Sequence, residues 1–338
     1  MQSPHTPVIY PLTAISDWKR QLAEAISSPA ELLQQLELGH LLDNYVDNKP
    51  DFRLRVPQAY LSKIKKGDAK DPLLLQILPT IAEKELTGAI DPVGDLEAMP
   101  SSGLLHKYHG RALIISTAAC AIHCRYCFRR HFPYSDAQAL SSQWPATLDY
   151  LKQHDEIQEV ILSGGDPLVL DDEKLKSLCD DLEKIPHLKW LRIHTRLPVV
   201  LPSRINPSLL EWLQNSRFSI TMVIHANHAN ELGNDEQIAL RALQSANITL
   251  LNQSVLLKNI NNQTDTLIDL SHRLHECGVI PYYLHLLDQV RGGLHFDVNS
   301  VKALQIIDNM RIKLPGYLIP RLVTEEKGQS SKTAISHI

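Results

Sequence analysis

Short apolar, β-branched runs alternate with amphipathic stretches through the carboxyl-terminal two-thirds of the chain. The apolar runs lie at 112–117, 159–164, 190–195, 218–226, 248–254 and 280–286. Apolar residues recur with helical spacing between them, at 141–154, 171–185, 206–215, 234–246 and 264–278. Strand alternating with helix is typical of parallel βαβ units. We therefore predict an α/β fold, a partial TIM-like (βα)6 barrel two strands short of a complete one, with a doubly wound sheet as the open alternative.

The first 105 residues have a different pattern, helical and irregular. Residues 18–26 and 28–39 carry helical spacing, and the second stretch has a Ser-Pro start and a glycine stop. Residues 50–64 continue that character, and proline-rich connectors follow up to about residue 103. We divide the chain into an N-terminal helical region at 1–105, the partial barrel at 106–320 and a C-terminal segment at 321–338.

The composition is typical of a globular protein, with 43% apolar residues, 21% charged residues and a formal net charge of −4. That balance offers no broad basic surface to a nucleic acid. The start of the sequence lacks the basic residues and apolar run of a signal peptide, and no apolar stretch is long enough to span a membrane. We expect a cytoplasmic protein without nucleic-acid or membrane partners. Two isolated cysteines, Cys179 and Cys277, are expected to be buried structural residues.

Three of the five cysteines lie within eight residues, as Cys120, Cys124 and Cys127 in a C-x3-C-x2-C arrangement. They follow the first predicted strand, at the end of a parallel barrel that carries catalytic groups. Three thiolates can bind three irons of a cubane cluster and leave the fourth iron open, as a catalytic site requires. The alternative is a zinc site in a non-enzymatic module, with His123 or His131 as the fourth ligand.

The extended string at 120–132, CAIHCRYCFRRHF, resembles the lysine 2,3-aminomutase family of radical S-adenosylmethionine (SAM) enzymes. The strings TRLPVVLP, NQSVLLKNIN and PYYLHLLD strengthen the resemblance. It implies that the three cysteines ligate a [4Fe-4S] cluster, which binds SAM and generates a 5′-deoxyadenosyl radical. The glycines of SGGDP allow close approach of a ligand. By resemblance, SAM is contacted by Ser163, Gly164, Gly165, Asp166 and His225.

The same resemblance implies pyridoxal 5′-phosphate (PLP) as a second cofactor. Lys332, in the stretch Gly-Gln-Ser-Ser-Lys-Thr, matches the family lysine that carries PLP, with Lys327 as its rival. The family proline after Lys-Thr is alanine here. By resemblance, the PLP pocket also includes Lys107, Tyr108, Arg111 and Gln253. Paired cations suit a phosphate dianion.

Lysine, the substrate implied by the resemblance, has a carboxylate and a distal ammonium. Arg129 matches the family arginine that binds the carboxylate, a role suited to a planar cation. Asp288 and Glu325 match two family aspartates that bind the ammonium, and the change to glutamate at 325 is a departure. The rival enzymatic functions are a radical SAM aminomutase acting on another amino acid and a different radical SAM enzyme that acts on nucleic acid.

The length of the chain resembles the short bacterial branch that makes (R)-β-lysine for translation elongation factor P. Longer family members have a C-terminal extension and a structural zinc, and the cysteine that contributes to that zinc is Gln263 here. We therefore expect no structural zinc. The implied partners are elongation factor P, the ligase that attaches β-lysine to it, and a reductant such as flavodoxin.

Overall fold

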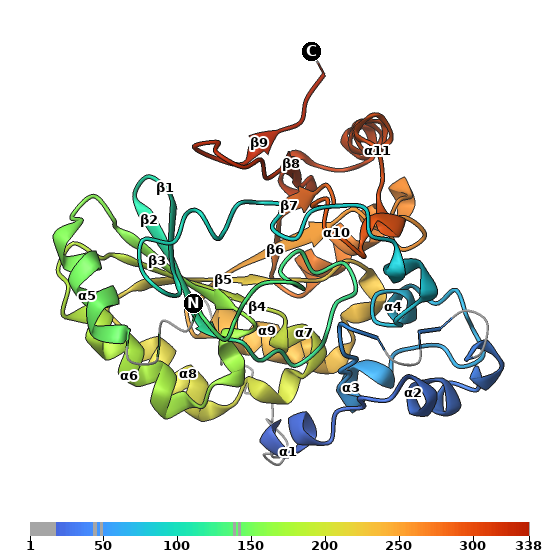
Figure 1. Cartoon of the computed structure of the whole chain (residues 1–338), viewed down its shortest axis with the longest axis horizontal. Helices are drawn as coiled ribbons and strands as arrows, with labels where there is room; N and C mark the ends of the chain where they lie inside the picture. The colour runs from blue at the N-terminus through green and yellow to red at the C-terminus, as the bar shows by residue number, and fades with distance from the viewer. Residues whose placement is uncertain (1–17, 43–45, 48–49, 138–139, 141–142, 338) are drawn as a thin grey trace, which may run out of the picture.

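The computed structural model describes residues 18–42, 46–47, 50–137, 140 and 143–337 (Figure 1). Nine strands form one sheet in which spatial order follows chain order from β1 to β9. Pairing is parallel from β2 to β8 and antiparallel at the two ends. The strands are β1 Leu104–Tyr108, β2 Arg111–Thr117, β3 Glu159–Gly164, β4 Trp190–Thr195, β5 Ser219–Ile224, β6 Thr249–Val255, β7 Ile280–His285, β8 Arg321–Thr324 and β9 Thr333–Ala334.

Sequential strand order distinguishes this fold from the doubly wound alternative, whose order reverses within the sheet. The strands β1 and β9 are the two ends of the sheet, so the barrel is open. All six predicted strands are confirmed. The prediction missed a seventh parallel strand, β8, because it is only four residues long, follows Pro320 and begins with an arginine.

Helices connect the parallel strands and cover the outer face of the sheet, as the α5, α6, α8 and α9 ribbons show (Figure 1). Helix α6 illustrates the cause: Asp171 caps its first turn, and Leu175, Leu178 and Leu182 form a buried stripe. The barrel helices are α5 Trp144–Gln153, α6 Asp172–Glu183, α7 Leu197–Val200, α8 Pro207–Asn215, α9 Asn234–Ser245, α10 Thr264–Glu276 and α11 Ser300–Lys313. All five predicted crossover helices are confirmed, whereas α7 and α11 were not predicted.

The N-terminal region contains less helix than its pattern predicted. Its helices are α1 Trp18–Ala23, α2 Pro29–Gln35, α3 Gln58–Leu61 and α4 Pro72–Leu75. The expectation of helix across 50–64 is wrong except at α3, because Val56 pairs with Ile26 in a β-bridge and Pro57 begins the helix only afterwards. Two expected boundaries between regions cut across the sheet. The boundary at residue 105 falls within β1, and the segment after residue 320 belongs to the sheet through β8 and β9. Cys179 and Cys277 are buried, as expected.

None of the helices in the described part of the chain is both long and apolar enough to span a membrane.

Candidate active site

A cavity of about 590 Å³ lies at the carboxyl ends of the parallel strands, covered by the cysteine loop and the C-terminal segment. Parallel barrels place catalytic groups at this end because every strand delivers its last side chain there. Every residue predicted to bind a cofactor, the cluster or the substrate lines this cavity: Lys107, Tyr108, Arg111, Cys120, Cys124, Cys127, Arg129, Ser163, Gly164, Gly165, Asp166, His225, Gln253, Asp288, Glu325 and Lys332. The rival Lys327 lies outside it, in an exposed ion pair with Glu97.

The three cysteines lie on the loop that leaves β2. Burial and the neighbouring thiols raise the pKa of Cys120 well above its usual value and raise that of Cys127 to about 11. Crowded thiols oppose one another's ionisation until a cation neutralises them, so this donor set fits a metal cluster.

The zinc alternative requires side chains that converge on one ion. Among the residues that the structure describes, no group of three or more His, Cys, Asp or Glu side chains does so. The ligands of a cubane bind separate irons and need not converge on one point. His123 and His131 have ring nitrogens 2.9 Å and 3.1 Å from the carbonyl oxygens of Arg53 and Arg291. The donor set therefore fits a cluster better than zinc.

The SGGDP turn has a structural role that the sequence did not reveal. A side chain at Gly165 would meet the carbonyl oxygen of Ala119 at 2.3 Å, so the glycine permits close packing against the cysteine loop. The Asp166 carboxylate accepts hydrogen bonds from Thr195 Oγ1 and the Arg196 backbone, both at 2.7 Å. Burial nevertheless raises the pKa of Asp166 above its usual value. The turn therefore packs closely against the cysteine loop and also lines the cavity, and its contact with SAM stays a prediction.

Lys332 lies in the C-terminal segment and bonds Glu325 Oε2 at 2.5 Å. Glu325 also accepts from Lys107 Nζ at 3.1 Å. Burial raises the pKa of Glu325, but the attraction of Lys332 and Lys107 outweighs it and brings the pKa to about 2. Glu325 therefore stays ionised and holds both lysines in the cavity. Because Lys107 is paired in this way, Arg111, which lies 4.7 Å over the Tyr108 ring, is the more available cation for a phosphate.

Asp95 is a functional candidate that the sequence analysis missed. Its carboxylate bonds Lys107 Nζ at 2.5 Å and Arg129 Nε at 2.7 Å. Burial raises the pKa of Asp95, but the attraction of Arg129 and Lys107 is stronger and the pKa lies below its usual value. Asp95 thus orients the guanidinium of Arg129, whose Nη1 also donates to Ser163 Oγ at 3.3 Å. Little in the sequence marks Asp95, since it lies in a proline-rich connector.

Asp288 has the opposite electrostatic situation. Burial and the nearby charge of Glu325 raise its pKa to about 7. No hydrogen bond or ion pair joins its carboxylate to another residue of the described chain. A bound cation would strongly stabilise the ionised form of such an acid, because a ligand ammonium would supply the counter-ion.

Two histidines on the cavity wall each have one ring nitrogen without a hydrogen-bond partner among the described residues. The Nε2 atoms of His194 and His285 are buried and form no hydrogen bond within the described chain. Buried polar atoms without partners are rare, and here they point to a ligand with acceptor or donor groups. Together with Lys332 and Arg111, they make the cavity chemically suitable for PLP.

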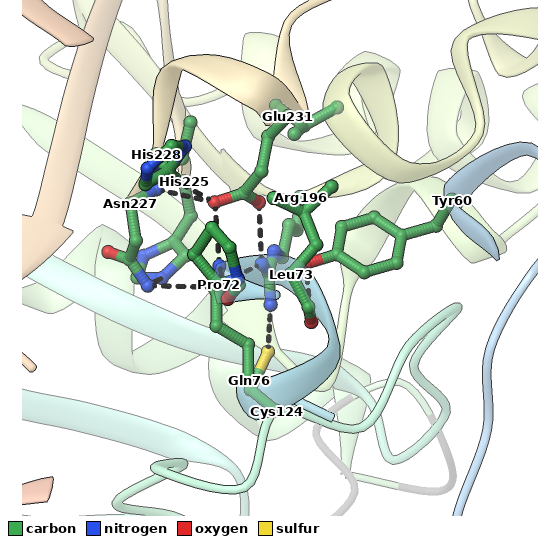
Figure 2. Close-up of polar contacts among 12 residues, drawn as sticks. Tyr60, Pro72, Leu73, Gln76, Cys124, Arg196, His225, Asn227, His228 and Glu231 are labelled. Atoms are coloured by element: carbon green, nitrogen blue, oxygen red, sulfur yellow. Dashed lines mark hydrogen bonds and ion pairs between the residues drawn. The ribbon is translucent and has the colours of Figure 1, made fainter. Parts of the chain in front are cut away.

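A buried polar network lies behind Cys124 (Figure 2). Arg196 follows the end of β4, donates to Cys124 Sγ at 2.6 Å and bonds Glu231 Oε2 at 2.7 Å. Tyr126 lies between the cysteines, with its hydroxyl 2.8 Å from His225 Nε2. Burial lowers the pKa of His225 to about 3, so its imidazole is neutral at pH 7. The position of Arg196 at a strand end was the signal that could have identified it.

An open parallel barrel with three cysteines on the loop after its first parallel strand defines the class as a radical SAM enzyme. The family model described as the radical SAM superfamily matches residues 114–270. The L-lysine 2,3-aminomutase of Escherichia coli is 44% identical, over 94% of each chain, and that of Haemophilus influenzae is 43% identical, over 98% of each. The Clostridium subterminale enzyme of that name is 33% identical over 95% of this chain and 78% of its own length.

The chain belongs to the lysine 2,3-aminomutase family of radical SAM enzymes, which are isomerases. Membership implies a [4Fe-4S] cluster, SAM and PLP. Among solved structures, a radical SAM methyltransferase from Sphaerobacter thermophilus is 13% identical, covers 65% of this chain and 68% of its own, and has a TM-score of 0.46. That similarity is too remote to support any statement about chemistry.

Proposed function

We propose that this chain is a PLP-dependent enzyme that converts L-α-lysine into (R)-β-lysine, and that the product serves the modification of elongation factor P. One observation carries the proposal: Lys332 shares a single cavity with the three cysteines and with two acids suited to a substrate ammonium. When bound, the cluster supplies the electron that cleaves SAM, and PLP carries the migrating amino group.

The chain's own residues bind and orient the substrate in this proposal. Arg129, fixed by Asp95, binds the lysine carboxylate through its remaining guanidinium N–H groups. Asp288 and Glu325 bind the ε-ammonium, and Glu325 exchanges its bond with Lys332 for one with the substrate. Cys120, Cys124 and Cys127 bind the cluster. The cysteine loop and the C-terminal segment flank the cavity and limit the access of water that would quench a radical.

The wider role rests on the resemblance to the short bacterial branch, and the match over nearly the whole length of two relatives supports it. The protein would act in the cytoplasm with a reductant of the flavodoxin type. A ligase would then attach β-lysine to a lysine of elongation factor P.

Anaerobic turnover tests the proposal. The protein, reconstituted with iron, sulfide and PLP, is incubated with SAM, a reductant and L-lysine, and the product is resolved by chiral chromatography. We expect (R)-β-lysine, and no product from glutamate or alanine. An Asp288→Asn/Glu325→Gln variant should lose lysine turnover, whereas Glu97→Gln, an exposed acid outside the cavity, should retain it. Equal turnover of glutamate, or an unaffected double variant, would contradict the substrate assignment.

Addition of elongation factor P and its ligase tests the wider role. We expect the mass of the factor to increase by one lysine residue only when the aminomutase reaction has run. An equal mass increase in the absence of this enzyme would contradict its role in the modification.

A further inference from the structure

Arg196 contacts Cys124, one of the three predicted cluster ligands, within a buried polar network (Figure 2). Its Nη1 lies 2.6 Å from Cys124 Sγ, while Nη2 donates to Glu231 at 2.7 Å and to Gln76 Oε1 at 2.8 Å. Arg196 is 6% exposed, and Glu231 and Gln76 are 0% exposed. Water therefore screens these charges little, and their effect on the neighbouring sulfur is strong.

The network fixes Arg196 in place from both ends. Its backbone N–H donates to Asp166 at 2.7 Å, and its guanidinium is held by Glu231. Glu231 is itself fixed, because its Oε1 accepts from the backbone of Asn227 at 2.8 Å and from Gln76 Nε2 at 3.1 Å. Because the guanidinium is already fixed, it points toward Cys124 with no further loss of conformational entropy.

Lys63 is a further cation near this site, and it is itself paired. Lys63 bonds Glu236 at 2.7 Å and donates to the Glu231 carbonyl at 2.9 Å. The guanidinium of Arg196 also lies 5.5 Å from the centre of the Tyr60 ring, over its face. Arg196 and Glu231 are thus the opposite charges whose sum sets the electrostatic potential at Cys124 Sγ.

We propose that Arg196 is a positioning residue that sets the reduction potential of the cluster through its hydrogen bond to Cys124, with Glu231 as the opposing charge. The inference rests on the proposed function, since it requires the cysteines to bind [4Fe-4S]. A one-electron reductant adds one electron to the cluster, and no bond at Arg196 forms or breaks. Hydrogen bonds and positive charge at cluster sulfurs stabilise the reduced, more negative state and raise its potential.

Two substitutions then shift the potential in opposite directions. Arg196→Met removes the donor and leaves the Glu231 charge without its partner, so reduction becomes harder. Glu231→Gln keeps the guanidinium and removes the negative charge, so reduction becomes easier. Tyr126→Phe is the matched control, because it removes a hydroxyl from the same network without changing a charge.

Potentiometry followed by electron paramagnetic resonance on the reconstituted protein, without SAM, PLP or lysine, measures the effect. We expect Arg196→Met to lower, and Glu231→Gln to raise, the equilibrium constant for reduction by about tenfold, which is about 59 mV for one electron. Tyr126→Phe should stay near wild type. A purely structural role would instead move both charge variants in the same direction, through a loosened cluster.

Shifts of the same sign, or an Arg196→Met shift no larger than that of Tyr126→Phe, overturn the proposal. If Arg196→Met does not assemble a cluster, the Glu231→Gln variant tests the proposal alone. An unchanged or lowered reduction potential in that variant overturns the proposal. Failure to turn over lysine would count against the proposed function and leave these potentials intact. A wild-type protein that binds zinc in place of the cluster would refute both.

Discussion

The Asp288 carboxylate lies in the cavity and forms no ion pair with another described residue, so its ionisation suits a cationic substrate but destabilises the fold. Burial and Glu325 raise its pKa from 3.8 to about 7. The folded protein therefore holds a proton that the unfolded chain releases above pH 4. As pH rises from 4 to 7, the free energy of unfolding falls, because the native state binds more protons than the unfolded one.

The size of the effect follows from the pKa difference. The free energy of unfolding falls by about 1.4 kcal/mol per pH unit between pH 4 and pH 7. The total loss is about 4 kcal/mol as an upper limit. Asp288→Asn has no proton to lose. Relative to wild type, we expect it to be progressively more stable as pH rises from 5 to 7, with a constant difference above pH 7.

Urea unfolding of the apoprotein at pH 5, 6, 7 and 8 measures this difference. Asp149→Asn, an exposed acid on α5, provides a control whose difference from wild type should change little with pH. In the same pH range, lysine should bind wild type more weakly below pH 7, where Asp288 is protonated. A stability difference between Asp288→Asn and wild type that does not vary with pH would refute the reasoning.

Three further predictions concern the other charged groups of the cavity. Lys332→Ala should lose the PLP that borohydride fixes to the protein, whereas Lys327→Ala should retain it; fixation unchanged in Lys332→Ala would identify a different lysine. Asp95→Asn should lower the free energy of unfolding by about 3 kcal/mol, since it strands buried cations, while the exposed Glu97→Gln should cost less than about 1 kcal/mol; equal costs would contradict the pairing. Glu325→Gln should be destabilising at pH 7, and thermal melts should show that cost shrinking as pH falls from 4.5 toward 2, because the pKa of Glu325 is lowered to about 2.

The parallel strands and crossover helices could be predicted because their patterns are local. β-branched runs and apolar stripes repeat within each segment and need no knowledge of the rest of the chain. The strand β8 escaped detection because its four residues carry too little pattern. The 50–57 segment was mistaken for helix because its β-bridge to Ile26 is a tertiary contact.

The contrast between local patterns and tertiary contacts also explains which site residues could be predicted. The cysteine spacing, the Ser-Ser-Lys-Thr stretch and Asp288 lie in strings that identify a family, and the structure gathers them in one cavity. The strand-end position of Arg196 marks it as a candidate, but its role and that of Asp95 depend on partners distant along the chain and could not be assigned from sequence. The glycines of SGGDP line the cavity, and the close packing of Gly165 against Ala119 is a second role that only the structure reveals.

Metal and cofactor content tests the central claim most directly. The anaerobically isolated protein should contain about four irons and one PLP per chain, with no stoichiometric zinc. Replacing the three cysteines with serine should remove the iron and leave the PLP, and Lys332→Ala should loosen the PLP and leave the iron. Zinc in place of iron, or PLP fixed equally well without Lys332, would contradict a cavity in which cluster and PLP meet.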